Sequence, residues 1–360
     1  MDYFEHSIPN RRGPAVKPDS PYPFDASVIA ISFNTRDLLR ECLKSIQDEF
    51  SRLPAGLSAE VLVVDNASGD GSAEMVESEF CASAIPVRLI RSAVNLGFGA
   101  ANNLAIAAAQ GRYPVLLNSD AFLHPGALAR AIAHMDADPS AGIGTARQVS
   151  RDGAPQPSAL RFHTIKRDAM MLSGLSAHFP RLRLFAALDW PAAGSSPSEP
   201  GKTREVDWSP GAFLILRREA LQKTGLFDPA FFLYYEEVDL CRRVKAAGYR
   251  IMHWPDVVVT HIGGESSRQV KSLLFSESAS QVVLWRMRST LLYYRKNHGA
   301  KVWLARWLEE GLYALRWLRN VRSRVAARRQ RAQEAQVLIR LLRQAWRETS
   351  GGRVSPPRPW

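Results

Sequence analysis

Three carboxylates fall within four consecutive positions of the chain, directly after a pair of aromatic residues. They are Glu236, Glu237 and Asp239, and Tyr234 and Tyr235 precede them. A carboxylate beside apolar side chains becomes more basic, which favours removal of a proton from a hydroxyl group. An acidic first turn also opposes the positive end of a helix dipole, so a structural role stays open. The pattern favours a general base at the start of a helix.

Two further residues have the chemistry of cation ligands. Asp120 follows an apolar run, and its carboxylate could hold Mg²⁺ or Mn²⁺ against the oxygens of a nucleotide diphosphate. The alternative role for Asp120 is a helix cap, although Pro125 places the next helix start several residues later. His261 ends another apolar run. A lone histidine is more often structural, but its position at a strand end before two glycines favours a ligand role.

Polar residues and glycines follow four successive apolar runs, which we interpret as strands. The predicted strands span residues 27–33, 60–65, 87–91 and 113–118. Predicted helices alternate with them, near residues 38–46, 73–80 and 100–110 and from Pro125 onward, as is typical of a parallel α/β sheet. The residues at the strand ends are Asn34, Asp65 with Asn66, Asn95 with Gly97 and Gly99, and Asn118 with Asp120. Because ligands collect at the carboxyl ends of such strands, we expect one ligand site there.

Several function classes are disfavoured by the sequence. Residues 95–102 lack the third glycine of GxGxxG, and the chain has no GxxxxGK[ST], which counts against a dinucleotide oxidoreductase and a P-loop NTPase. The three cysteines are far apart and form no CxxC pair, which disfavours a disulfide scaffold or a zinc ribbon. The apolar runs are much shorter than the about 20 residues of a membrane-spanning helix, and residues 1–23 have no apolar signal core. We therefore expect a cytoplasmic protein.

The chain of 360 residues divides by composition into a short lead, a body and a basic tail. Prolines interrupt residues 1–25, which we expect to be flexible. Beyond an irregular stretch at 151–204, we predict helices at 218–224 and 236–247, one or two strands at 249–261, and helix throughout 280–349.

Residues 268–360 of the tail carry a net charge of +15, the rest of the chain carries −3, and the tail holds six of the nine tryptophans. Basic charge mixed with Trp indicates either an anionic membrane surface or nucleic acid. On a helical wheel, Trp303, Trp307, Leu315 and Leu318 share one broad apolar face, the geometry of a helix lying in a membrane interface. The same face could instead pack on the catalytic body or on a second subunit of a homo-oligomer.

Six ordered segments resemble glycosyltransferase family 2, with the order and spacing of its rhamnosyltransferase-like branch. The resemblance covers about residues 27–266 and part of the tail through residues 294–299. The segments are 27–34, 61–72 (VLVVDNASGDGS), 95–103 (NLGFGAANN), 116–123 (LLNSDAFL), 225–251 (GLFDPAFFLYYEEVDLCRRVKAAGYRI) and the H-x-G-G-x-S of 261–266.

The resemblance implies an inverting enzyme of the GT-A fold, a Rossmann-like mixed sheet flanked by helices, here with a C-terminal helical extension. The expected domain is residues 26–266, with a nucleotide-sugar half at 26–122 and an acceptor half at 123–266. A basic, Trp-rich helical region at 267–360 follows it.

The family's functional residues map onto named positions of this chain. Asp65 is similar to the residue that recognises the nucleotide base, and Asp120 matches the last acid of the DxD-type metal motif. Glu237 takes the place of the catalytic base, where the family's Glu-Asp motif has Asp, and His261 resembles a metal-binding histidine. The resemblance implies a nucleotide-sugar site of Asn34, Asp65, Asn95, Gly97, Asn118 and Asp120, an acceptor side of Gly211, Glu236 and Asp239, and metal ligands Asp120 and His261.

The predicted function is transfer of a sugar, with rhamnose favoured, from a nucleotide-diphosphate donor such as dTDP-rhamnose or a UDP-sugar. The acceptor would be a glycan or a lipid-linked acceptor of cell-envelope polysaccharide synthesis, reached from the inner face of the cell membrane. Residues 281–285 lack the arginine of the QxxRW motif of processive synthases, so we expect addition of single sugars. The alternatives are a non-catalytic sugar-nucleotide or glycan-binding protein on the same fold and, less favoured because the tail has no known reader motif, a nucleic-acid-binding protein.

Overall fold

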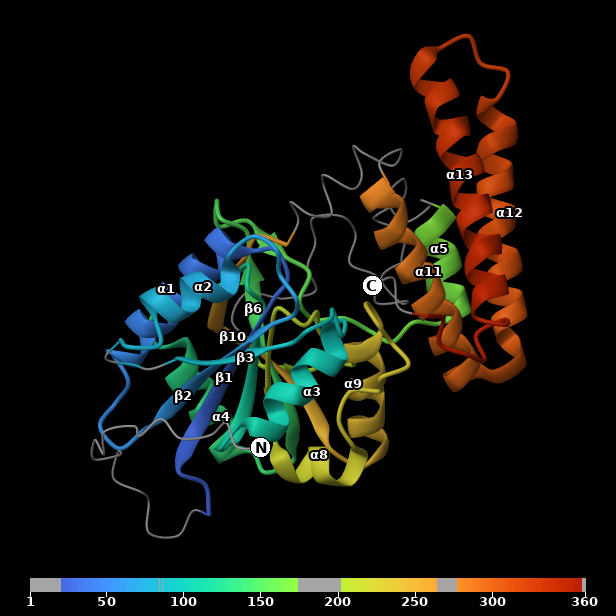
Figure 1. Cartoon of the computed structure of the whole chain (residues 1–360). Coiled ribbons are helices and arrows are strands. Elements are labelled where there is room, and N and C mark those ends of the chain that lie inside the picture. The colour runs from blue at the N-terminus through green and yellow to red at the C-terminus, as the bar shows by residue number, and fades with distance from the viewer. Residues whose placement is uncertain (1–20, 84, 86, 174–201, 264–276, 358–360) are drawn as a thin grey trace, which may run out of the picture.

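The computed structural model describes residues 21–83, 85, 87–173, 202–263 and 277–357, and Figure 1 shows their arrangement. A central sheet has the strand order β3-β2-β1-β4-β9-β6-β10-β5. The predicted lead overlaps the first strand, which begins at Phe24 instead of the predicted Ser27. Residues 1–20 of that lead, and most of the irregular stretch 151–204, lie outside the described residues.

The first half of the sheet is parallel and follows the predicted alternation. β1 pairs in parallel with β2 and β4, and β2 pairs in parallel with β3. These elements are β1 (Phe24–Ser32), α1 (Arg36–Phe50), β2 (Ala59–Asp65), α2 (Ser72–Glu79), β3 (Val87–Arg91), α3 (Phe98–Ala108) and β4 (Gly111–Leu117).

The second half makes the sheet mixed, as the GT-A resemblance implies. β9 runs antiparallel to β4 and β6, and β5 runs antiparallel to β10. β10 is one strand whose register with β6 is interrupted between Trp254 and Val258, where Pro255 lies. The elements are β5 (Ala121–Leu123), α4 (Ala127–Ala137), β6 (Ala141–Val149), β7 (Pro155–Gln156), α5 (Ile165–Ser173), β8 (Arg204–Glu205), β9 (Phe213–Leu216), α8 (Arg218–Thr224), α9 (Glu236–Ala246) and β10 (Arg250–His261).

β6 is a central strand that the apolar pattern does not predict. Its sequence contains Gly142 and Gly144, and glycine weakens a strand signal. The structure explains Gly144, because a Cβ atom there would lie 1.9 Å from the indole ring of Trp254. The glycine is needed for close packing between neighbouring strands, which no local pattern reveals.

Two hydrophobic cores cover the two faces of the sheet. One core contains Leu39 and Leu43 of α1, Val76 of α2 and Leu128 of α4. The other contains buried residues of α3, α8 and α9, such as Ala105, Leu221 and Leu240. A sheet with helices on both faces is the layer arrangement expected of α/β proteins.

The tail is helical, as predicted, and it forms three long helices. They are α11 (Glu277–His298), α12 (Val302–Asn320) and α13 (Ala326–Glu348), with a short 3₁₀ turn at Gly299–Lys301. A third core joins α11 and α13 to the segment before α9 through Phe231, Tyr293 and Leu342. Among the described residues, no helix combines the length and the apolar character needed to span a membrane.

α12 turns its polar side toward the other helices and leaves much of its apolar side exposed. Glu310 is buried and pairs with Arg306 and with Arg343 of α13. Trp307 and Leu318, by contrast, are 59% and 62% exposed. In Figure 1, α12 and α13 form a hairpin that projects beyond the rest of the molecule.

Candidate active site

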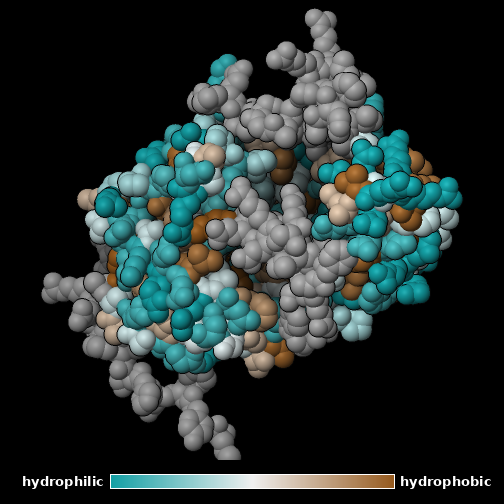
Figure 2. All heavy atoms as spheres, turned by 90° about the horizontal axis from the view of Figure 1, so that it is seen from above, coloured by the Kyte–Doolittle hydropathy of each residue, from teal (hydrophilic) through white to brown (hydrophobic). Residues whose placement is uncertain are grey.

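A cavity of about 620 Å³ opens at the carboxyl ends of the parallel strands. Of the six predicted nucleotide-sugar residues, Asn95, Gly97, Asn118 and Asp120 line it. The structure therefore brings the ends of β3 and β4 to one cavity, as the strand-end pattern predicts. Figure 2 shows hydrophobic surface on the sheet domain, on the side that faces the C-terminal helices.

The sheet itself brings Asp120 and His261 together. β5 begins one residue after Asp120 and pairs with the end of β10, where His261 lies opposite Ala121. The amide of Ile262 donates to the carbonyl oxygen of Asp120 at 3.0 Å. As a result, Asp120 Oδ1 and His261 Nε2 lie 3.4 Å apart, and both side chains remain partly exposed.

These two side chains fit a divalent cation that is shared with a diphosphate. Oxygen and imidazole donors suit Mg²⁺ or Mn²⁺, and such ions are commonly held by one or two carboxylates together with substrate phosphates. Asn118 adds a buried Oδ1 with no hydrogen-bond partner among the described residues. Among the described residues, no cluster of three or more His, Cys, Asp or Glu side chains could hold a metal ion by itself.

Asn34 and Asp65 lie next to the cavity, not on its wall. Asn34 has a φ of 55° and accepts a hydrogen bond from the amide of Gly69 at 2.8 Å. It lines a neighbouring cavity of about 320 Å³, and Thr35 lines both cavities. Asp65 is buried at the end of β2, where its Oδ2 accepts from the amide of Ser68 while its Oδ1 has no partner among the described residues.

A pair of asparagines shapes the loop after β3. The Asn66 amide nitrogen donates to Asn95 Oδ1 at 2.9 Å, and Asn66 Oδ1 accepts from the amide of Leu96 at 2.8 Å. Gly97 has a φ of +80°, and a Cβ atom there would lie 2.2 Å from the carbonyl oxygen of Phe232. Only glycine allows this approach, which fixes the loop against the segment that leads into α9.

The two glutamates of the predicted base motif begin α9 beyond this segment. Tyr234 and Tyr235, just before them, both have a φ of 68°, an uncommon conformation for bulky residues. Glu236 is buried against the start of α3, where its Cβ lies 3.4 Å from the position of a Cβ on Gly99. Neither Glu236 nor Glu237 is on the wall of the 620 Å³ cavity, whose nearest lining residues along the chain are Phe232 and Leu233.

Burial makes both glutamates more basic than usual. It raises the pKa of Glu237 to about 7, and it raises the pKa of Glu236 well above its ordinary value, with the charge of Glu237 adding to the effect. Glu236 Oε2 and Glu237 Oε2 are both buried, and neither has a hydrogen-bond partner among the described residues. With a pKa of about 7, Glu237 is partly ionised at neutral pH and can then accept a proton from a hydroxyl group.

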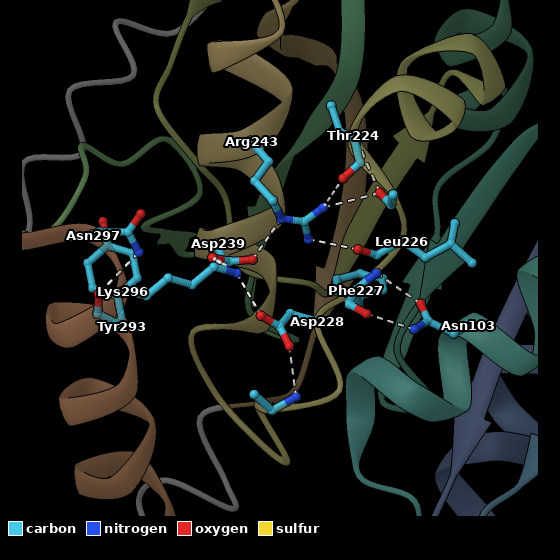
Figure 3. Close-up of polar contacts among 12 residues, drawn as sticks. Asn103, Thr224, Leu226, Phe227, Asp228, Asp239, Arg243, Tyr293, Lys296 and Asn297 are labelled. Atoms are coloured by element: carbon cyan, nitrogen blue, oxygen red, sulfur yellow. Dashed lines mark hydrogen bonds and ion pairs between the residues drawn. The ribbon is translucent and has the colours of Figure 1, made fainter. Parts of the chain in front are cut away.

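Asp239, predicted on the acceptor side, makes two ion pairs. Its carboxylate lies 2.8 Å from Arg243 and 2.8 Å from Lys296 of α11, and the side chain is buried. Lys296 also pairs with Asp228 at 2.6 Å. Figure 3 shows these contacts, with Arg243 reaching the carbonyl oxygens of Thr224 and Leu226. Asp239 therefore joins α9 to α11 and to the loop that precedes α9.

Gly211, also predicted on the acceptor side, lies behind the ring of Phe98. A Cβ atom on Gly211 would be 3.1 Å from that ring, which itself lines the cavity. Gln281 and Trp285 of α11 line the cavity from the other side, and the Phe232 and Trp285 rings lie 4.4 Å apart. None of these three lining residues, Phe98, Gln281 and Trp285, belongs to the predicted site. For Gln281 and Trp285, the sequence signal that could have placed them in the site was the partial QxxRW pattern of residues 281–285.

The family whose sequence profile matches this chain is described as Glycosyl transferase family 2, and the match covers residues 27–239. The chain belongs to this family, and it is a glycosyltransferase that resembles rhamnosyltransferases. It is 27% identical over 317 residues to the N-acetylglucosaminyl-diphospho-decaprenol L-rhamnosyltransferase of Mycobacterium tuberculosis, covering 84% of this chain and 95% of that protein. It is also 31% identical over 92 residues to the rhamnosyltransferase WbbL of Escherichia coli, covering 26% of this chain and 32% of WbbL.

A solved structure confirms the GT-A fold class. The mannosyltransferase PcManGT of Pyrobaculum calidifontis, in complex with GDP-Man and Mn²⁺, superposes with a TM-score of 0.52 at 16% sequence identity. The superposition covers 91% of this chain and 90% of that protein, so it extends beyond the sheet domain into the C-terminal helices.

Proposed function

We propose that this glycosyltransferase is an inverting, metal-dependent rhamnosyltransferase that uses dTDP-rhamnose, with UDP-sugars as the next candidate donors. The observation that carries the proposal is that Asn118 and Asp120 line the strand-end cavity and that His261 lies 3.4 Å from the Asp120 carboxylate. The donor diphosphate would lie at these residues, where a divalent cation would neutralise the charge of the departing group. Asn34, Asp65, Asn95 and Gly97 would hold the nucleotide beside them.

The proposed chemistry needs one base and one direction of attack. Glu237 takes the proton of an acceptor hydroxyl, and the resulting oxygen attacks the anomeric carbon on the side opposite the diphosphate. The new glycosidic C–O bond forms as the bond to the diphosphate oxygen breaks, which inverts the anomeric configuration. The proton remains on the Glu237 carboxyl group, whose raised pKa suits this role.

The proposed acceptor is a sugar linked through a diphosphate to a polyprenyl lipid. The mycobacterial relative is named for such an acceptor, and the alignment spans nearly all of that protein. Transfer to a lipid-linked sugar would belong to cell-envelope polysaccharide synthesis. It would take place at the inner face of the cell membrane, which the protein would reach from the cytoplasm.

The exposed side of α12 supports contact with that membrane. Trp303, Leu304, Trp307 and Leu318 are between 44% and 62% exposed, and Figure 2 shows hydrophobic atoms at the surface of the C-terminal helices. Tryptophan is suited to the headgroup region of a bilayer. At the end of the hairpin, Arg322, Arg324, Arg328, Arg329 and Arg331 add positive charge, each of which contributes about 1 kcal/mol toward an anionic surface.

Calorimetry of donor binding tests the metal-dependent site. We expect dTDP-rhamnose to bind with Mn²⁺ present and to bind at least about tenfold more weakly with EDTA or in Asp120→Ala. Glu219→Gln, a change of an exposed acid on α8, serves as the control and should bind like the wild type. Unchanged affinity and turnover in Asp120→Ala would remove Asp120 from the site.

A further inference from the structure

One face of α11 contacts the loop that leads into α9, residues 225–235, at each successive turn of the helix. The contacts come from Trp285, Ser289, Tyr293 and Lys296, which we call the α11 stripe. Their spacing of four, four and three residues places them on one face of the helix. The stripe therefore joins the C-terminal region to the segment that carries the proposed base.

Three members of the α11 stripe hold the loop by its side chains. They make two ring contacts and one ion pair, with ring centroids 4.4 Å apart for Trp285 and Phe232 and 5.2 Å apart for Tyr293 and Tyr235, and with Lys296 2.6 Å from Asp228. The Tyr235 ring also lies 4.7 Å from the His163 ring. Figure 3 shows Lys296 reaching from α11 toward Asp228 and Asp239.

The fourth member, Ser289, holds the backbone of the loop. Its hydroxyl donates to the carbonyl oxygen of Leu233 at 2.7 Å, and the serine side chain is buried. A serine inside a helix often bonds a carbonyl oxygen of its own preceding turn, whereas this hydroxyl bonds a different element. Because the peptide group is planar, this hydrogen bond fixes the orientation of the whole plane between Leu233 and Tyr234.

That plane lies directly before two strained residues. Tyr234 and Tyr235 both have a φ of 68°, and bulky residues keep such a conformation only where surrounding contacts determine it. The angle φ of Tyr234 is the rotation about the bond that follows the plane. Holding the Leu233 carbonyl oxygen in place therefore restricts how the chain can relax at Tyr234.

The catalytic domain fixes the same loop at earlier residues. The amide of Phe98 donates to the carbonyl oxygen of Phe232 at 2.9 Å, and Asn103 bonds both the amide and the carbonyl oxygen of Phe227. Figure 3 shows the loop between Asn103 of α3 and Lys296 of α11. With the chain fixed up to Phe232, the contact at Leu233 decides how it turns into α9.

This turn connects the cavity to the proposed base. Phe232 and Leu233 line the 620 Å³ cavity, and Tyr235 is the residue that caps the start of α9. Glu237 follows two residues later, in the first turn of that helix. A rotation at Tyr234 or Tyr235 would redirect the start of α9 and with it the Glu237 carboxyl group.

We propose that Ser289 is a positioning residue, which holds the turn at Tyr234 and Tyr235 through the Leu233 carbonyl oxygen and so directs the Glu237 carboxylate toward the acceptor. The proposal rests on the proposed role of Glu237 as the base. It gives the C-terminal region a function in the chemical step, because α11 would set the geometry of the base as well as line the donor cavity.

Hydrogen exchange tests the positioning without any substrate. Ser289→Ala removes one hydroxyl and is well suited to a helix, so we expect it to fold. Amides of residues 233–239 should exchange at least about threefold faster than in the wild type, because the turn loses the bond that holds it. The control is Ser78→Ala, which removes a hydroxyl that bonds carbonyl oxygens of its own helix, α2, and should leave this exchange unchanged. Unchanged exchange in Ser289→Ala would overturn the proposal.

Kinetics separate positioning of the base from a general structural role. We expect kcat of Ser289→Ala to fall about five- to tenfold, the effect of one hydrogen bond, while donor affinity stays within about twofold because the proposed donor contacts lie at the strand ends. A merely structural role would lower the melting temperature and leave kcat unchanged, and that result would overturn the proposal. An equal loss of kcat and donor affinity would also overturn it. If Ser289→Ala lowers kcat but Glu237→Gln keeps full activity, the role of Ser289 in placing the turn holds and the assignment of the base fails.

Discussion

Glu236 and Glu237 are adjacent in sequence but have different surroundings. Glu236 packs against the start of α3, and burial together with the charge of Glu237 raises its pKa well above the ordinary value, whereas burial raises the pKa of Glu237 to about 7. A base must be ionised before it reacts and must stabilise the proton afterwards. A pKa of about 7 makes Glu237 the better candidate for both tasks near neutral pH.

Replacing Glu237 with glutamine keeps the size of the side chain but removes the base. We expect the transfer rate to fall by at least about 10²-fold while donor affinity is retained. The turnover of Glu236→Gln is measured in parallel. Near-normal turnover in Glu237→Gln together with loss of turnover in Glu236→Gln would identify Glu236 as the base. Because ionised Glu237 is buried at a cost, Glu237→Gln should melt no lower than the wild type at about pH 8.

The raised pKa of Glu237 also predicts how the rate depends on pH. The base acts only when ionised, and its pKa of about 7 means that protonation removes it as the pH falls through that value. We expect kcat/KM at about pH 6 to be about a tenth of its value at about pH 8. A flat profile over this range, measured with Mn²⁺ saturating throughout, would show that no group with this pKa limits the reaction.

The polar residues of the site could be predicted because they follow strands. Asn118 and Asp120 end a clear apolar run, and parallel strands end at a common edge. Phe98 and Trp285 could not be predicted in this way, because an apolar side chain on a cavity wall looks the same in sequence as one in the core. His163 is a single histidine in an irregular stretch, and its hydrogen bonds run through Asp168 of α5 to Tyr294 of α11.

At the level of elements, Lys296 provides an ion pair that joins α9 to α11. Lys296→Met leaves the buried Asp239 with Arg243 as its remaining ion-pair partner and should lower the free energy of unfolding by about 1–2 kcal/mol. Since the Glu237 side chain lies on the same helix, kcat should fall more than donor affinity. Thermal melts and kinetics beside Lys301→Met, an exposed lysine nearby, separate this effect from a general loss of charge. Equal melting temperatures for the two variants would contradict the role of Lys296.

Contacts between distant residues decide two features of the elements. The unpredicted strand β6 depends on Gly144, which admits the Trp254 ring, and α12 buries Glu310 because it meets Arg343 of another helix, which leaves the apolar face exposed as an interfacial helix requires. Periodicity predicts that an amphipathic helix exists, and it assumes that the apolar face is the buried one. Partners that are distant in sequence decide which face is buried.

For the whole molecule, the exposed side of the hairpin predicts binding to anionic vesicles. We expect the full chain to float with such liposomes at low salt, and Trp307→Ser to reduce the bound fraction several-fold by removing an exposed indole. Leu104→Ser, at an exposed apolar residue of α3, is the control and should bind like the wild type. Equal flotation of both variants would exclude the hairpin from the membrane contact. If the wild type instead dimerises in a concentration-dependent way and Trp307→Ser does not, a second subunit covers the exposed side of the hairpin.

The most direct measurement is transfer itself, followed by NMR of the product. The purified full chain is incubated with dTDP-rhamnose and a short-chain polyprenyl-diphosphate-linked N-acetylglucosamine, with Mn²⁺ or with EDTA. The predicted result is a rhamnosylated acceptor of anomeric configuration opposite to that of the donor, formed with Mn²⁺ and at least about 10²-fold more slowly with EDTA. A product that retains the donor configuration, equal rates with EDTA, or transfer from UDP-sugars but not from dTDP-rhamnose would contradict the proposed reaction.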